Sequence, residues 1–273
     1  MVEGQPNQGG IELTALPAGG VDATSSSPPQ ARANPVAGAI LGVLLALIIA
    51  LTVAEIVAAF VPLYRPALRE AAVREQLFSP AGRLPASADE FETALVHILA
   101  YCNGRVDDAQ VLLRAATAEG EVLLVPGLSP DEVAHLADVR WLFAAAKQLR
   151  NLMAFFLVGV LIPLAMTAPQ RFRQYARLVL LWTGGGTLVL LAGGLMAVTG
   201  GFDAAFEGFH RLLFSNDLWL LPADSLLITM LPGWLFARLA AIIAVGTAVI
   251  GGLAGLMGLR WRIVSPEGTG GQS

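Results

Sequence analysis

The residues best suited to chemistry lie in the stretch from Gly201 to Trp219, where one histidine stands among aromatic residues. If this stretch is a helix, Phe202, Phe206 and His210 fall at i, i+4 and i+8 and share one stripe. Asp217 follows His210 by two helical turns and would return to nearly the same face. Histidine suits a general base at neutral pH, because its unperturbed pKa is about 6.5.

A second histidine lies in a predicted helix that begins at Ser129-Pro130-Asp131-Glu132, where Ser129 and Glu132 can form a capping box. That helix carries His135 and Asp138 three residues apart, so the carboxylate could fix the imidazole tautomer. After His210, the amide of Asn216 could hold a developing negative charge on oxygen. Taken singly, each histidine is better explained as a packing or surface residue. Taken together, the two leave a shared site as an equal alternative. The third histidine, His97, lies off the apolar face of its predicted helix and receives no role.

Several classes of site are not supported by the sequence. There is no G-x-S-x-G elbow, P-loop, dinucleotide fingerprint or H-E-x-x-H motif. The only cysteine is Cys102, which excludes an internal disulfide. Two separated histidines without a third ligand make a poor metal site, so we expect neither a metal nor a cofactor. A net charge of −4 gives no basic surface for nucleic acid, and we expect no nucleic-acid partner.

The elements that must position these residues belong to a membrane protein. Of the 273 residues, 55% are hydrophobic and 14% are charged, against about a quarter charged in soluble domains. Four apolar runs are long enough to cross a bilayer core of about 30 Å. We therefore expect an all-α membrane protein with transmembrane helices over 35–63, 150–168, 178–200 and 235–259 and a mostly helical extracytoplasmic cap.

Arginine clusters predict the topology. Arg171, Arg173 and Arg177 crowd one short connection, and Arg260 and Arg262 follow the last apolar run, so both regions should be cytoplasmic. The expected order is a disordered cytoplasmic tail over 1–34, a cap over 64–149, a cytoplasmic loop over 169–177, an extracytoplasmic active-site segment over 201–234 and a cytoplasmic tail over 260–273. Three arginines after the first apolar run disagree with this order and are outweighed by the two downstream clusters.

Within the cap, we expect helices over Asp89–Gly104 and Asp107–Thr117 and a short strand over Glu121–Val125. A straight helix from Ser129 onward would lift His135 about 24 Å above Asn151, far from a membrane surface. We therefore expect either an earlier start of the second membrane span or a bend between Trp141 and Arg150.

One ionisable residue, Glu55, lies well inside the first predicted span. Two interpretations stay open for it. It is either a site group that faces the protein interior or a residue near the outer membrane surface that bonds to a neighbouring helix.

At these residues the sequence resembles a known family, the lipoprotein intramolecular transacylases. LSPDEVAHLADVRWLF (128–143) resembles the family segment E-x-x-H-x-x-D-V-(K/R). FDAAFEGFHRLLFSNDLWLL (202–221) resembles the family segment F-x-x-F-H-x-x-x-F-x-N-D-x-W. YCNG (101–104) and SLLITMLPGWLF (225–236) also fit, in the same order along the chain.

The resemblance implies an enzyme that acts on lipoproteins whose N-terminal cysteine bears a diacylglyceryl group. The sn-2 acyl chain would move to the α-amino group of that cysteine and give the lyso-form lipoprotein. The family's two catalytic histidines map by motif onto His135 and His210. The expected supporting and pocket residues around them are Asp138, Asn216, Asp217, Phe206, Phe209, Phe214 and Trp219.

The implied chemistry needs no Ser or Cys nucleophile from the protein, because the amine of the substrate attacks. One histidine would act as a base toward that amine, and the other would stabilise the oxyanion or protonate the leaving alkoxide. The two roles could be exchanged between His135 and His210. The expected partners are diacylglyceryl lipoproteins and membrane lipid, and the expected location is the bacterial plasma membrane.

Two other functions compete with a transacylase. The first is a non-catalytic membrane scaffold or receptor whose cap binds a partner protein. The second is a transporter, against which the single deep ionisable residue argues. Convergence of His135 and His210 favours an enzyme, whereas a separation of more than about 15 Å favours a scaffold.

Overall fold

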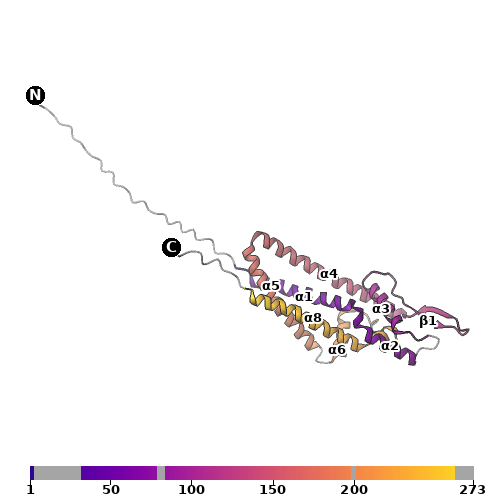
Figure 1. Cartoon of the computed structure of the whole chain (residues 1–273). Helices are drawn as coiled ribbons and strands as arrows, with labels where there is room; N and C mark the ends of the chain where they lie inside the picture. Colours follow the sequence, from indigo (N-terminus) through magenta and orange to yellow (C-terminus); the bar gives the residue numbers. More distant parts are fainter. Residues whose placement is uncertain (3–31, 79–83, 198–200, 262–273) are drawn as a thin grey trace. The chain divides into compact units, whose positions relative to one another are not determined.

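The computed structural model describes residues 1–2, 32–78, 84–197 and 201–261 (Figure 1). Most of the two predicted tails, 1–34 and 260–273, lies outside these residues. The body that begins at Ala33 forms one compact unit. The described secondary structure is almost entirely helical, with one short β-hairpin, which confirms the predicted all-α membrane class.

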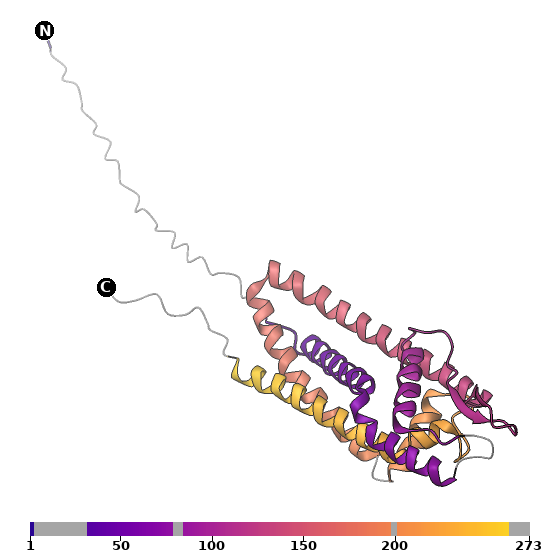
Figure 2. The ribbon, with the colours of Figure 1, turned by 45° about the vertical axis from the view of Figure 1, so that its right-hand side comes forward.

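Four helices are long and apolar enough to cross a membrane: α1 (Pro35–Ala59), α4 (Pro130–Thr167), α5 (Pro169–Ala197) and α8 (Gly233–Arg260). Helices α1, α5 and α8 pack against one another, and α4 packs against α1 and α5 (Figures 1 and 2).

Glycines allow these helices to approach closely. A methyl group on Gly184 of α5 would lie 2.9 Å from the Cα of Gly255 on α8, so the two backbones touch at this crossing. On α1, a methyl group on Gly42 would lie 2.5 Å from the Cβ of Trp182. Without a hydrophobic driving force between helices in lipid, such backbone contact is a main source of association.

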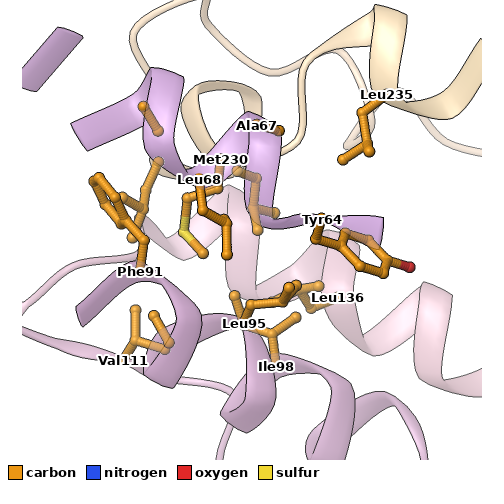
Figure 3. Close-up of a cluster of buried hydrophobic side chains, with 14 of the residues drawn as sticks. Tyr64, Ala67, Leu68, Phe91, Leu95, Ile98, Val111, Leu136, Met230 and Leu235 are labelled. Atoms are coloured by element: carbon orange, nitrogen blue, oxygen red, sulfur yellow. The ribbon is translucent and has the colours of Figure 1, made fainter. Parts of the chain in front are cut away.

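The shorter elements are η1 (Val61–Leu63), α2 (Arg65–Phe78), α3 (Ala88–Cys102), β1 (Leu112–Ala116), β2 (Val122–Pro126), α6 (Phe202–Leu213) and α7 (Leu226–Met230). Side chains from α2, α3, α4 and α7 form one apolar core, in which Leu68, Phe91, Leu136 and Met230 are buried (Figure 3). This core joins the segment after α1 to the N-terminal end of α4.

The helix predicted over Asp107–Thr117 is wrong. Residues predicted as a helix over Asp107–Thr117 contain strand β1, which pairs antiparallel with β2. Val111 and Leu113 are buried while Leu112 is exposed, and this alternation has the period of a strand. The short run of apolar residues concealed that period.

The sequence predicts either an earlier start of the second membrane span or a bend between Trp141 and Arg150. Helix α4 is uninterrupted from Pro130 to Thr167, so the structure shows no break of the helix for the second alternative. Its 38 residues span about 57 Å, nearly twice the apolar thickness of a bilayer. All its charged residues lie between Pro130 and Arg150, so this part cannot lie in hydrocarbon without a large energetic cost. Residues 169–177, expected to be a loop, belong to α5, and only Ala168 separates α4 from α5.

Glu55 of α1 forms ion pairs with Arg150 and, at 3.8 Å, with Lys147, both on α4. Lys147 Nζ also donates to Asn103 Oδ1 at 2.6 Å, beyond the end of α3. Of the two interpretations of Glu55, the structure therefore supports the bond to a neighbouring helix. The cluster ties α1, α3 and α4 together where the charged part of α4 ends.

The crossing of α5 and α8 generates a stability prediction. Gly184→Ala should destabilise the protein by about 1–3 kcal/mol, because the added methyl group meets backbone that cannot move aside. Gly193 lies on the same helix with no neighbouring atom within 4 Å, so Gly193→Ala should be neutral or stabilising. Thermal unfolding of the detergent-solubilised variants measures the difference. Equal midpoints for the two variants would contradict the close crossing.

Candidate active site

Helix α6 carries the histidine that the sequence places among aromatic residues. His210 is 8% exposed, and the rings of Phe206, Phe209, Phe214 and Trp219 lie between 4.1 and 5.7 Å from its ring, centroid to centroid. The predicted i, i+4 stripe forms as expected within α6. Each of the four aromatic residues predicted to surround this histidine therefore contacts it.

The tautomer of His210 follows from one hydrogen bond. Its Nδ1 lies 2.8 Å from the carbonyl oxygen of Phe206. A carbonyl oxygen can only accept, so Nδ1 must carry the proton in this bond. In the neutral ring, Nε2 then bears a lone pair and can accept a proton.

His135 lies on the second turn of α4, whose predicted capping box is present. Ser129 Oγ accepts from Glu132 N at 3.3 Å, and Glu132 Oε2 accepts from Ser129 N at 2.8 Å. The ring of His135 lies 6.2 Å from that of His210 and 5.5 Å from that of Phe214. His135 and His210, 75 positions apart in the sequence, thus lie much closer than about 15 Å, the separation beyond which a scaffold would be favoured over an enzyme.

The environment of His135 favours its neutral form. The residue is half-buried, and its Nδ1 is buried without a hydrogen-bond partner among the described residues. Burial lowers the pKa of His135 below its ordinary value of 6.5, and the neighbouring His210 lowers it further. The carboxylate of Asp138 acts in the opposite direction. Because the pKa is lowered, the uncharged ring predominates at neutral pH.

The sequence suggested that Asp138 fixes the tautomer of His135, but the structure gives Asp138 another partner. Its Oδ2 instead accepts a hydrogen bond from Asn216 Nδ2 at 2.9 Å. The Oδ1 of Asn216 accepts from Leu218 N at 3.1 Å, which orients the amide. One N–H of Asn216 is therefore committed to Asp138, and the pair joins α4 to the segment after α6.

The expected position of Asp217 is wrong. Helix α6 ends at Leu213, so Asp217 does not return to the face of His210. The residue is exposed, and its backbone oxygen accepts from Leu220 N at 3.0 Å in a turn. The role predicted for Asp217 was based on helical spacing, and because the helix ends before this residue, that spacing does not support the role.

Glu132 is a structural residue that sequence reasoning recognised only in part. It is 2% exposed, and its Oε1 accepts from Leu227 N in α7 at 2.8 Å, in addition to the capping bond. The capping-box motif indicated the local bond, whereas no local signal indicates a partner 95 residues away.

The third histidine lies elsewhere. His97 is half-buried, and its Nε2 contacts the carbonyl oxygen of Asp108 at 2.9 Å, within its own region of the chain. Among the described residues, no three His, Cys, Asp or Glu side chains gather as metal ligands would. The arrangement at His135 and His210 can instead accept, hold and return a proton within an aromatic enclosure.

Comparison with known proteins identifies a family and a fold to which this chain is similar. The family model described as lipoprotein intramolecular transacylase Lit matches residues 39–236. No curated protein sequence matches the chain.

The solved structures that match are those of the membrane-integral lipoprotein intramolecular transacylase Lit from Bacillus cereus. One has a TM-score of 0.59 and 18% identity, over 83% of this chain and 94% of that chain. A histidine-to-arginine variant of the same protein has a TM-score of 0.56 and 17% identity, over 82% and 90% of the two chains. At these identities, the likeness shows that the fold is shared.

The bond between Asp138 and Asn216 should be measurable as a coupling. Asp138→Ala and Asn216→Ala should each destabilise the protein, and the double variant should lose less than the sum. We expect a coupling of about 1–3 kcal/mol, because one partner is a carboxylate. Chemical or thermal unfolding of the four proteins in detergent gives the cycle. Strict additivity would show that the two side chains do not interact.

Proposed function

This chain belongs to the lipoprotein intramolecular transacylase family Lit, and from that premise we propose how its two packed histidines work. The protein is an acyltransferase of the membrane that acts on lipoproteins, and it moves an acyl chain within one substrate molecule. No feature of the described residues favours a scaffold. The observation that carries the proposal is the 6.2 Å separation of the His135 and His210 rings inside an aromatic enclosure.

The substrate is a lipoprotein whose N-terminal cysteine carries a diacylglyceryl thioether. The α-amino nitrogen of that cysteine attacks the sn-2 ester carbonyl, an acyl–nitrogen bond forms and the acyl–oxygen bond breaks. Starting from the neutral amine, one proton moves from nitrogen to the glycerol oxygen, so this step neither consumes nor releases a proton. The α-ammonium group, with an ordinary pKa of about 7.7 to 8.0, first loses one proton to become nucleophilic.

His210 is assigned as the base toward the amine. Its Nδ1 donates to the Phe206 carbonyl, which leaves Nε2 to accept the proton of the attacking nitrogen. The fixed tautomer means that no ring rotation or proton shift is needed before the transfer. A positioned base of this kind typically contributes about 100- to 10,000-fold in rate.

His135 is assigned to the ester oxygens. Burial keeps its ring neutral, and a neutral ring still has one N–H, which can donate a hydrogen bond to the oxyanion. The proton that His210 takes from the attacking nitrogen then passes to the leaving alkoxide, so both rings end the reaction neutral. The supporting residue in this scheme is Asp138, which holds Asn216 beside the pair.

The aromatic side chains around His210 serve as the substrate pocket. Phe206, Phe209, Phe214 and Trp219 surround the ring, and Phe209 is 51% exposed, so the enclosure has an apolar border. An apolar border suits acyl chains that enter from the bilayer. Since nucleophile and ester belong to one molecule, holding them in a reactive geometry can lower the barrier by several kcal/mol, up to about 7–11.

The orientation in the membrane is also part of the proposal. The arginines at the start of α5 lie on the cytoplasmic side, together with both termini. The segment 64–149 and the α6 region then lie outside the cytoplasm of a bacterial cell, where the N-terminus of a lipoprotein is exposed.

Substitution of either histidine should abolish the reaction. His135→Ala and His210→Ala should each lower the conversion of a diacyl lipopeptide to the N-acyl, monoacyl form by about 100- to 10,000-fold. Mass spectrometry of the product in membranes that carry each variant measures the conversion. Near wild-type conversion by His210→Ala would refute the assigned base.

His97→Ala is the matched control, because the same residue type is removed from a position whose hydrogen bond goes to the backbone of Asp108, within its own region. It should leave conversion nearly unchanged. Asn216→Ala should give an intermediate loss, through the contact that it makes with Asp138.

Single cysteines can test the orientation. Ala118 is exposed in the turn between β1 and β2, and Gln170 is exposed at the start of α5, while the native Cys102 is buried. A cysteine at position 118 should react with a membrane-impermeant thiol reagent in intact cells. A cysteine at position 170 should react only after lysis. The opposite pattern would invert the topology.

A further inference from the structure

Strand β2 presents apolar side chains to solvent on both of its faces. Val122 is 57% exposed, Leu123 49% and Leu124 64%. Within the described residues, β2 pairs with β1 alone, while the far edge of β1 receives a hydrogen bond from Leu84 N at 3.0 Å. Exposed apolar residues on an unpaired edge strand are unusual, because such edges promote association unless they are blocked.

The register shows which backbone groups face outward. Gly127 N donates to Val111 O at 2.8 Å, one position beyond the last residue pair of the ladder. Hydrogen-bonded and non-hydrogen-bonded pairs alternate along an antiparallel ladder. The N–H and C=O groups of Val122 and Leu124 therefore point away from β1, toward the open edge.

We propose that this edge binds the polypeptide of the lipoprotein substrate, as an extended strand beyond its acylated cysteine. The inference rests on the proposed function, which requires the first residue of the substrate to react while the rest of the chain leaves the site. An extended peptide that adds to a sheet edge gains main-chain hydrogen bonds independent of its sequence. That mode suits an enzyme whose substrates share a lipid group and differ in sequence.

The reach of the chain makes this geometry possible. Strand β2 ends at Pro126 and α4 begins at Pro130, four residues on, a span of at most about 14 Å. His135 lies five residues further, about 7.5 Å along the helix. The end of β2 is therefore within about 22 Å of His135. About seven residues of extended substrate cover that distance, so later residues can pair with β2.

Charge at the hairpin argues against a lipid surface as the occupant. Glu119 and Glu121 are exposed in the turn that precedes β2. The anionic lipids of a bacterial membrane would repel the two carboxylates beside the strand. A neutral or basic peptide would not be repelled. Strand β2 is also followed in the chain by α4, which carries His135.

The test compares two diacylglyceryl-cysteine peptides that differ in length, one with about four residues and one with about sixteen. The wild-type protein should convert the longer peptide with a KM lower by about threefold to tenfold, the range expected for one or two peptide hydrogen bonds. Methylation of alternate backbone nitrogens in the longer peptide should remove that advantage in one register and not in the other. Equal KM values for all peptides would overturn the proposal.

Leu124→Pro tests the same edge from the side of the enzyme. The proline removes an N–H that faces outward, so the pairing of β1 and β2 keeps its hydrogen bonds. Its KM for the longer peptide should rise to that of the shorter one, with kcat unchanged and the shorter peptide unaffected. Leu123→Pro is the matched control, because it removes an inward N–H and should lower the stability of the hairpin.

Other results would assign the edge differently. Loss of a dimer in Leu124→Pro, with unchanged kinetics, would assign it to a second copy of this chain. A dependence on anionic lipid content without dependence on peptide length would assign it to the membrane surface. Either result would overturn the proposal. Failure of the wild-type protein to convert even the short peptide would instead refute the proposed function itself.

Discussion

Two carboxylates on α4 hold the segment that follows α6 in place. Glu132 and Asp138 stand three residues before and three residues after His135, and each accepts a hydrogen bond from that later segment. Glu132 receives Leu227 N, and Asp138 receives Asn216 Nδ2. Because these contacts flank His135 on both sides, they fix the distance between α4 and the residues that pack on His210. The geometry of the histidine pair depends on them.

The long apolar helices supply the rigid frame for this contact. Glycines on α5 and α8 let the backbones of these two helices touch. Helix α6 lies in the chain segment that connects them. Phe206 of α6 packs on Phe236 of α8, with 5.4 Å between ring centroids. The ion pairs of Glu55 fix α4 against α1 at the level where charged residues give way to apolar ones. The site therefore lies between elements that cannot shift independently.

The same arrangement suits an acyl transfer in which the substrate supplies the nucleophile. The aromatic residues exclude water around His210, and the backbone of α6 sets its tautomer. Burial keeps His135 uncharged beside it, with 6.2 Å between the centroids of the two rings. A substrate that carries both the amine and the ester needs only to be held there, with a path outward for its polypeptide.

The sequence by itself determined the features that depend on neighbouring residues. Apolar runs long enough for a bilayer predicted the four helices, and Ser129 with Glu132 predicted the start of α4. The spacing of Phe206 and His210 predicted the aromatic stripe. Each of these features depends on residues that are close in the sequence, so the local sequence pattern predicts it.

Only the tertiary structure decided the features that depend on distant partners. The pairing of β1 with β2 replaced an expected helix, because the burial of Val111 and Leu113 against the core sets their alternation. Asp138 turned from His135 to Asn216, a residue 78 positions away, and α6 ended before Asp217 could share its face. A contact between segments far apart in the chain leaves no local pattern. The resemblance implied a shared role for His135 and His210, but only the packed helices decide how close the two rings lie.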